Sequence, residues 1–174
     1  HLSATGAEWL HEVNNLPSSS VLALVEIDHD DLWVGENGGG IAHWRAGTWE
    51  RFTIEDGLAA NFVTSISRDQ DGVYWFGTVA GITRFDPQSW RLWRRQDGAP
   101  TARIEAIVKD GVGRLWVGSF GDGVHVFADN RWQHPQDVGF PAFPNLSFIE
   151  TAFIDADGAV WFGVIPLEVV YWRA

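Results

Sequence analysis

The chain has 174 residues, enough for one domain with a hydrophobic core, and a formal net charge of −11 at pH 7. Such an acidic surface repels phosphate backbones and anionic membrane surfaces, so we expect no nucleic acid among the partners. Cysteine is absent, which excludes disulfides, thiolate metal sites and cysteine nucleophiles. We expect a single domain over residues 1–174, and the sequence leaves open that it is part of a larger protein or ring.

The chain shows no sign of a membrane segment. No apolar run reaches the roughly 18 to 20 residues that span a bilayer, and the start HLSATGAEW lacks the basic-then-apolar pattern of a signal peptide. We therefore expect no membrane insertion. The composition, with 19 Gly, 7 Pro, 11 Trp and 11 Phe, is typical of short strands joined by many turns.

An aromatic motif repeats along the chain. A Trp followed by Val or Phe and then Gly recurs at spacings of 42, 41 and 45 residues, at Trp33, Trp75, Trp116 and Trp161. A fixed period of this size is typical of repeat architectures. We divide the chain into repeats at about 5–46, 47–86, 87–129 and 130–174.

A second tryptophan ladder has the same period. Its members recur at intervals of 40, 41 and 42 residues, at Trp9, Trp49, Trp90 and Trp132. Four short strands are predicted per repeat, and in the second repeat they begin at Val63, Val73, Gly81 and Trp90. Four strands at this period predict a blade of a β-propeller, so we expect an all-β fold with four antiparallel strands per blade and the Trp ladders in the core.

The two ends of the chain differ in their phase within the repeat. The segment around Trp9 has the phase of an outer strand, whereas Trp172 to Ala174 align with a third strand and the turn after it. We expect the N-terminal strand to join the last blade and close the ring, because pairing removes two exposed sheet edges. A ring of four blades, an eight-bladed ring of two chains and a fragment of a larger ring all agree with the sequence.

The second repeat resembles the two-component regulator propeller repeat. The matching residues are Asp56, Gly57, Leu58, Asn61, Val63, Asp69, Asp71, Gly72, Trp75, Gly77, Thr78, Gly81, Ile82, Arg84, Phe85 and Asp86. The resemblance implies a sensor-type propeller, and such propellers usually form extracytoplasmic modules of bacterial regulators. It therefore favours a periplasmic or extracellular location, and a cytoplasmic location also agrees with the sequence. The fourth repeat departs from the pattern after Val164, where IPLEVVYW replaces the expected glycine-containing turn.

Loops at one face of a propeller converge around its axis and favour ligand sites. The residues predicted there are Glu36, Asn37, Asn61, Phe62, Arg103, Phe120, Asp122, Asn145 and Phe148. Amides, an arginine and phenylalanines suit a small polar or carbohydrate-like ligand, although such residues are also common in ordinary turns. We expect non-catalytic recognition of such a ligand or of a protein, and a homodimer stays open. Trp44, Trp93 and Trp172 fall outside both ladders and are further candidates for exposed contacts.

Two alternatives compete with a recognition propeller. A propeller lyase-like enzyme would need a histidine beside a carboxylate, and the sequence offers His125 with Glu105 or Glu150. A purely structural or protein-binding ring would instead present a flat apolar rim.

No metal and no cofactor are expected. The DQDG segment from Asp69 and the DADG segment from Asp155 carry too few carboxylates for calcium, so we interpret both as hairpin turns.

Overall fold

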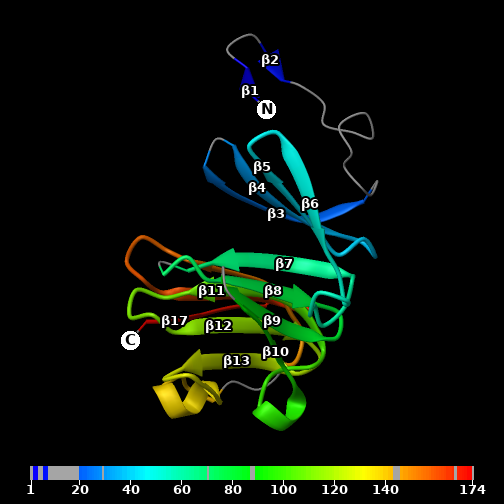
Figure 1. The fold of residues 1–174 in the computed structure, drawn as a ribbon. Helices are drawn as coiled ribbons and strands as arrows, with labels where there is room; N and C mark the ends of the chain where they lie inside the picture. Colours follow the sequence, from blue (N-terminus) through cyan, green and yellow to red (C-terminus); the bar gives the residue numbers. More distant parts are fainter. Residues whose placement is uncertain are drawn as a thin grey trace.

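The computed structural model describes residues 2–3, 6–7, 20–28, 30–69, 71–86, 89–142, 146–166 and 168–173. These residues form antiparallel sheets and two short 3-10 helices, which confirms the all-β propeller-like fold. Four successive sheets, called blades 1 to 4 below, follow one another along the chain (Figure 1). The described part contains no helix long and apolar enough to cross a bilayer.

Each blade is a meander of neighbouring strands. Blade 1 contains β3 (Val21–Asp28), β4 (Asp31–Glu36), β5 (Ile41–Arg45) and β6 (Thr48–Phe52). Blade 2 contains β7 (Val63–Arg68), β8 (Tyr74–Thr78), β9 (Gly81–Asp86) and β10 (Ser89–Trp93). Blade 3 contains β11 (Arg103–Lys109), β12 (Leu115–Phe120), β13 (Gly123–Ala128) and β14 (Arg131–Gln133). Blade 4 contains β15 (Ile149–Ile154), β16 (Val160–Val164) and β17 (Glu168–Trp172).

The remaining elements lie between and before the blades. The 3-10 helices η2 (Arg95–Asp97) and η3 (Pro135–Val138) follow the outer strands of blades 2 and 3. The short strands β1 (Leu2–Ser3) and β2 (Gly6–Ala7) pair with each other. Blade 4 has three strands among the described residues, and Trp9, whose segment is predicted to complete it, lies outside them. Ring closure therefore stays a prediction.

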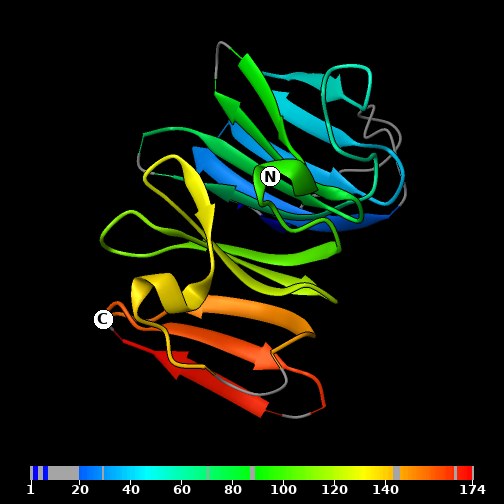
Figure 2. The same ribbon diagram turned by 90° about the horizontal axis from the view of Figure 1, so that it is seen from below.

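The sheets fan out from their first strands, because β3, β7, β11 and β15 make the main contacts between consecutive blades. Blades 1 and 4 lie at opposite ends of this array (Figure 2). The sequence repeats are offset from the sheets, since β6 falls in the stretch 47–86 but pairs with β5 of blade 1. A repeated sequence pattern predicts the length of each repeat, but it does not predict at which residue one blade ends and the next begins.

Each contact between consecutive blades, called a seam below, has a glycine at its centre. The glycine of the aromatic motif lies under an aliphatic residue at the start of the next blade's inner strand, so a Cβ on Gly35 would come within 2.9 Å of Val63 Cγ1. The same approach recurs at Gly77 with Ile104 (2.5 Å) and at Gly118 with Ile149 (2.4 Å). The motif needs glycine because the next blade, and at Gly77 also Ser65 of the same sheet, occupies the space of a side chain.

The first Trp ladder forms much of the core, as predicted. Trp33, Trp75 and Trp116 are 2%, 3% and 0% exposed, and each packs toward the following blade. Trp93 was predicted to be exposed and this was wrong: it is 4% exposed, packed near Trp132 with the Arg91 guanidinium 3.6 Å from its ring centroid. Residues of a strand alternate between its two faces, and in β10 Trp90 packs on the side of blade 1 and Trp93 on the side of blade 3.

Aspartates close the hairpins between first and second strands. Asp69 Oδ1 accepts hydrogen bonds from the backbone N–H groups of Asp71 and Val73, and Asp155 Oδ1 does the same for Asp157 and Ala159. These contacts confirm the interpretation of both segments as hairpin turns. In blade 4 the second oxygen of Asp155 also accepts the indole N–H of Trp161 at 2.7 Å.

Candidate ligand-recognition site at the inner rim

A β-bulge occurs at the same place in every inner strand. The register with the second strand shifts between Val21 and Ala23 in blade 1, and the corresponding shift recurs in the other three blades. The residues left out of the ladder are Leu22, Thr64, Glu105 and Glu150. A bulge re-aims the extra side chain away from the ladder, and bulges are common beside binding sites.

Aromatic residues from successive blades meet next to these bulges. Phe120, at the end of β12, forms an isolated bridge with Phe148, and their ring centroids are 4.9 Å apart. Both side chains are exposed, at 42% and 43%. Arg103 pairs with Phe120 in the ladder and lies with its guanidinium carbon 5.9 Å from the Phe62 ring centroid.

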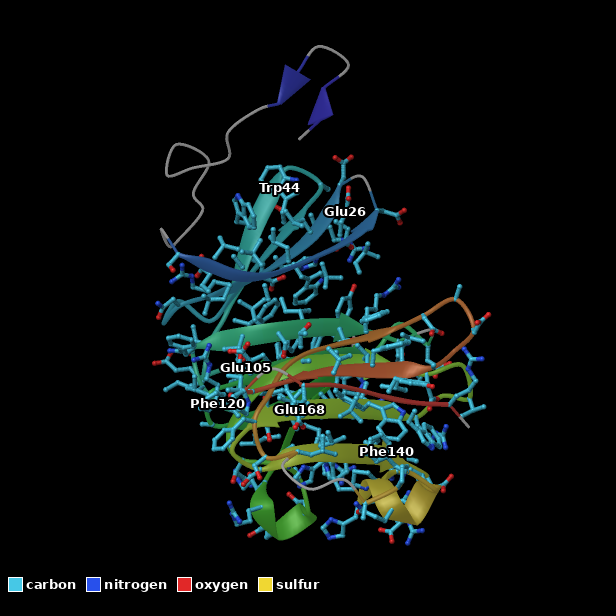
Figure 3. The ribbon with its side chains drawn as sticks, turned by 180° about the vertical axis from the view of Figure 1, so that it is seen from behind. Glu26, Trp44, Glu105, Phe120, Phe140 and Glu168 are labelled. Carbon is cyan, nitrogen blue, oxygen red and sulfur yellow. The ribbon has the colours of Figure 1, made fainter. Side chains whose placement is uncertain are left out.

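A charged group adjoins the aromatic residues. Arg103 Nε lies 2.7 Å from Glu105 Oε1, in a pair whose side chains are 50% and 14% exposed. Burial raises the pKa of Glu105, Arg103 opposes the rise, and the charge of Glu150 adds to it. Glu105 and Phe120 are both labelled in Figure 3. We call Phe62, Arg103, Glu105, Phe120, Phe148 and Glu150 the inner-rim cluster.

The cluster offers three kinds of interaction to a ligand. The phenylalanine rings provide exposed faces for stacking. A guanidinium has five N–H donors, of which the contact with Glu105 uses Nε. The two glutamates accept hydrogen bonds. This combination fits a small polar molecule that has both an apolar face and hydroxyl groups.

Four of the predicted site residues thus come together, Phe62, Arg103, Phe120 and Phe148. Asn37 joins their edge through an isolated bridge with Phe62. Asn145 lies outside the described residues. Sequence reasoning placed Glu105 and Glu150 only in the enzyme alternative, because nothing in the residue pattern reveals the bulge that sets them apart.

Three other predicted residues have structural contacts instead. Glu36 is fully buried, and its Oε2 accepts a hydrogen bond from Arg51 at 3.2 Å, which ties the β4–β5 turn to β6. Asn61 Oδ1 accepts the N–H of Ile54 at 2.8 Å.

Asp122 fastens a loop rather than facing the cluster. One of its oxygens accepts the N–H groups of Thr101 and Ala102 at 2.9 and 3.0 Å. The hydrogen bond from Thr101 contributes most to lowering the pKa of Asp122. This carboxylate is therefore held by the segment that leads into β11.

Among the described residues, His125 does not form the pair with Glu105 that the enzyme alternative requires. Glu105 pairs with Arg103, whereas the charges that act on His125 belong to Asp122, His134 and Arg95. The His125 ring centroid lies 6.5 Å from that of His134. His125 is thus part of a separate group at the β12–β13 turn and η3.

A cavity of about 560 Å³ lies at the outer part of the seam between blades 1 and 2. Its polar lining includes Asp31, His43, Arg45, Glu50, Arg68 and Tyr74. His43 Nε2 lies 2.9 Å from Asp31 Oδ1 and its ring stacks on Trp33 at 3.9 Å. Burial, with a contribution from Asp31, raises the pKa of Tyr74. This cavity shows that charged residues from both blades meet where a seam opens to solvent.

Fold and cluster together define a propeller with a polar and aromatic inner rim, and comparison with known proteins agrees with that class. Residues 57–80 match the family model described as "Two component regulator propeller", which confirms the resemblance for that repeat. No curated protein matches the chain significantly.

Several solved structures share the fold. Virginiamycin B lyase from Staphylococcus aureus superimposes with a TM-score of 0.67 at 13% identity, over 90% of this chain and 56% of the lyase. PorZ, a surface component of the type-IX secretion system of Porphyromonas gingivalis, gives 0.66 at 23% identity, over 86% and 24%. The extracellular domain of the putative one component system BT4673 from B. thetaiotaomicron gives 0.50 at 18%, over 90% and 28%. The chain thus spans about half the length of the lyase and a quarter of the other two.

Proposed function

We propose that this propeller is a non-catalytic recognition module that binds a small carbohydrate-like ligand at the inner-rim cluster. The observation that carries the proposal is the convergence of the exposed Phe120–Phe148 pair with the Arg103–Glu105 ion pair on adjoining blades. A sugar has an apolar face of C–H groups that stacks on aromatic rings and hydroxyls that both donate and accept hydrogen bonds.

The charge of the cluster narrows the ligand class. Its one arginine is already engaged by Glu105, and Glu150 adds a second carboxylate nearby. A strongly anionic ligand would be repelled by these groups and by a chain with a net charge of −11. The proposal is therefore a neutral saccharide whose hydroxyls donate to the glutamates and accept from Arg103.

A sensory role outside the cytoplasm is the physiological setting that we propose. It is supported by the regulator-propeller match of residues 57–80 and by the fold shared with the extracellular domain named above. Blades 2 to 4 contribute the residues of the rim. In this role the effect of ligand binding there would be transmitted through the rigid packing between the blades.

Calorimetric titration with cellobiose, maltose and a uronic-acid disaccharide tests the proposal. We expect a neutral disaccharide to bind, the acidic one to bind more weakly, and Phe120→Ala and Arg103→Met each to lower the affinity about tenfold, which corresponds to about 1.4 kcal/mol. Val112→Ala is the control, because Val112 is 74% exposed in the β11–β12 turn, at the opposite end of β11 from Arg103.

Two results would contradict the proposed site. The first is the absence of binding by all three disaccharides. The second is an affinity that Val112→Ala lowers and Phe120→Ala leaves unchanged. A preference for the acidic disaccharide would show that Arg103 is more available than its contact with Glu105 indicates, and would overturn the neutral-ligand assignment.

A further inference from the structure

Three seams among the described residues are built in the same way, and blades 4 and 1 present the two kinds of surface that meet in such a seam. At each of these three seams an aliphatic residue at the start of an inner strand lies on the motif glycine of the preceding blade. The inner-strand residues Val63, Ile104 and Ile149 are consequently 0% exposed. Val21, the equivalent residue of blade 1, is 41% exposed.

The second of these two surfaces lies on blade 4. Gly163 is the motif glycine there, and a Cβ built on it would meet Thr151 of its own sheet and no inner strand of a following blade among the described residues. Val169, the ladder partner of Gly163, is 69% exposed. The equivalent partners in blades 1 to 3 are Ile41, Ile82 and Val124, which are 0%, 0% and 7% exposed.

Aromatic residues extend this free face of blade 4. Trp161 stacks between Phe153 and Tyr171, at centroid distances of 5.8 and 4.6 Å, and these two rings are 53% and 57% exposed. Trp33, Trp75 and Trp116 at the equivalent position are covered by the next blade. Blade 1 offers a matching apolar surface, where Leu24 is 60% exposed although its equivalent Ile107 is 7% exposed.

The end faces of blades 1 and 4 carry charged residues of opposite sign, and Arg173 on blade 4 also contacts Asp157 of its own blade at 3.1 Å. At the seam between blades 1 and 2, Arg45 and Arg68 line one cavity from opposite sides. By ladder register, Arg173 at the end of blade 4 is equivalent to Arg45, and Glu26 of blade 1 is equivalent to Arg68. The pair of like charges at the seam between blades 1 and 2 thus corresponds to a pair of opposite charges on the end faces of blades 4 and 1. Glu26 and Trp44 lie at the end of the array remote from the other blades (Figure 3).

We propose that a second copy of this chain docks head-to-tail, with Val21 of its blade 1 seated on Gly163 of blade 4 in the first copy. The contact repeats the packing of the three internal seams and places Glu26 of one copy beside Arg173 of the other. Because the two faces differ, the interface is heterologous, and two such contacts between two copies close a ring of eight blades.

Light scattering over a range of concentrations tests this interface in the intact chain. We expect the mass to rise from the 19.4 kDa of one chain toward twice that value. Val21→Asp and Val169→Asp each place a carboxylate in the contact and should weaken association at least about 100-fold, since apolar residues at the centre of an interface dominate its affinity. Val112→Asp is the control, because Val112 is 74% exposed in the β11–β12 turn.

Mixing the two variants distinguishes head-to-tail from symmetric association. Each variant retains one intact face, so Val21→Asp and Val169→Asp, monomeric when alone, should form a heterodimer and nothing larger when combined. Thermal unfolding of each variant at the wild-type temperature shows that the loss of association is not a loss of fold.

Three outcomes would overturn the proposal. One is a wild-type mass of 19.4 kDa at every concentration. Another is association that neither aspartate variant weakens. The third is a monomer in which backbone amides of β3 and β17 are protected from hydrogen exchange, because another segment of the same chain would then cover both faces. None of these results depends on whether a saccharide binds at the rim.

Discussion

The side chain of Ile149 rests on the α-carbon of Gly118, so closely that a Cβ at residue 118 would lie 2.4 Å from Ile149 Cγ2 and 3.0 Å from Ile149 Cβ. The backbone of Gly118 requires no left-handed conformation, so its glycine is explained by space alone. The absence of a Cβ at Gly118 thus allows blades 3 and 4 to pack this closely.

Gly118→Ala should therefore destabilise the fold by overpacking. We expect a loss of about 1–3 kcal/mol in the free energy of unfolding, measured by urea denaturation, because a core at native density resists added methyl groups. Gly163→Ala should cost less at concentrations where the protein is monomeric, because among the described residues a Cβ there meets only Thr151 of its own sheet. Equal losses would show that strain within each sheet, and not the seam, requires the glycine.

Asp110 is expected to be a larger contributor to stability than its place in a turn suggests. It is 5% exposed, and its Oδ2 accepts hydrogen bonds from Arg114 Nε at 2.6 Å and Trp116 Nε1 at 2.8 Å. Burial alone would raise the pKa of Asp110, but these donors hold it below 3.8. Asp110→Asn should cost about 2–4 kcal/mol at pH 7, since it leaves buried charged and polar partners unmatched.

The sign of the pH dependence follows from the lowered pKa. The contribution of Asp110 is fully present above the ordinary carboxyl value and is lost as the pH falls through its folded-state pKa. Urea denaturation at pH 7 and pH 3 should thus show a smaller difference for Asp110→Asn than for wild type. Asp71→Asn, an 83% exposed turn residue, is the control; a matching reduction in that variant would contradict a specific role for Asp110.

His125 should make the protein less stable in mildly acidic solution. Its Nδ1 is buried without a hydrogen-bond partner in the described structure, and burial lowers its pKa below 6.5, with Asp122 opposing the shift. Below pH 6.5 the unfolded chain binds the proton first, so the free energy of unfolding should fall by up to about 1.4 kcal/mol per pH unit until the folded-state pKa is reached. His125→Gln should remove this slope between pH 7 and 5, and His134→Gln should leave most of it. A slope unchanged in His125→Gln would assign it to another group.

Glu105 should titrate above its ordinary value of 4.5. A carboxyl-selective NMR titration should show the pKa rising further in Arg103→Met, because the opposing cation is removed, and falling in Glu150→Gln, because a neighbouring negative charge is removed. If Glu105 titrates at 4.5 in the wild type and does not respond to either change, the carboxylates of the inner-rim cluster are independent and solvated.

The sequence predicts the repeat more completely than the site. Trp33, Trp75 and Trp116 each fill the equivalent place in their own seam. Their regular spacing in the sequence therefore predicts a contact between blades. The hairpin aspartates are equally local, since Asp69 bonds residues two and four positions ahead. The burial of Glu36 could not be predicted in this way. It depends on a hydrogen bond from Arg51, which lies fifteen residues further along the chain on another strand.

The bulges of the inner strands have a consequence for how such a protein can change. Leu22, Thr64, Glu105 and Glu150 stand outside the ladder register of their strands, so replacing one of these side chains leaves the pairing of its sheet intact. The four blades already differ there, with an aliphatic, a hydroxyl and two acidic groups. Each repeat thus has one position at the rim whose side chain can change without altering the sheet. Duplication of a repeat would add one more such position.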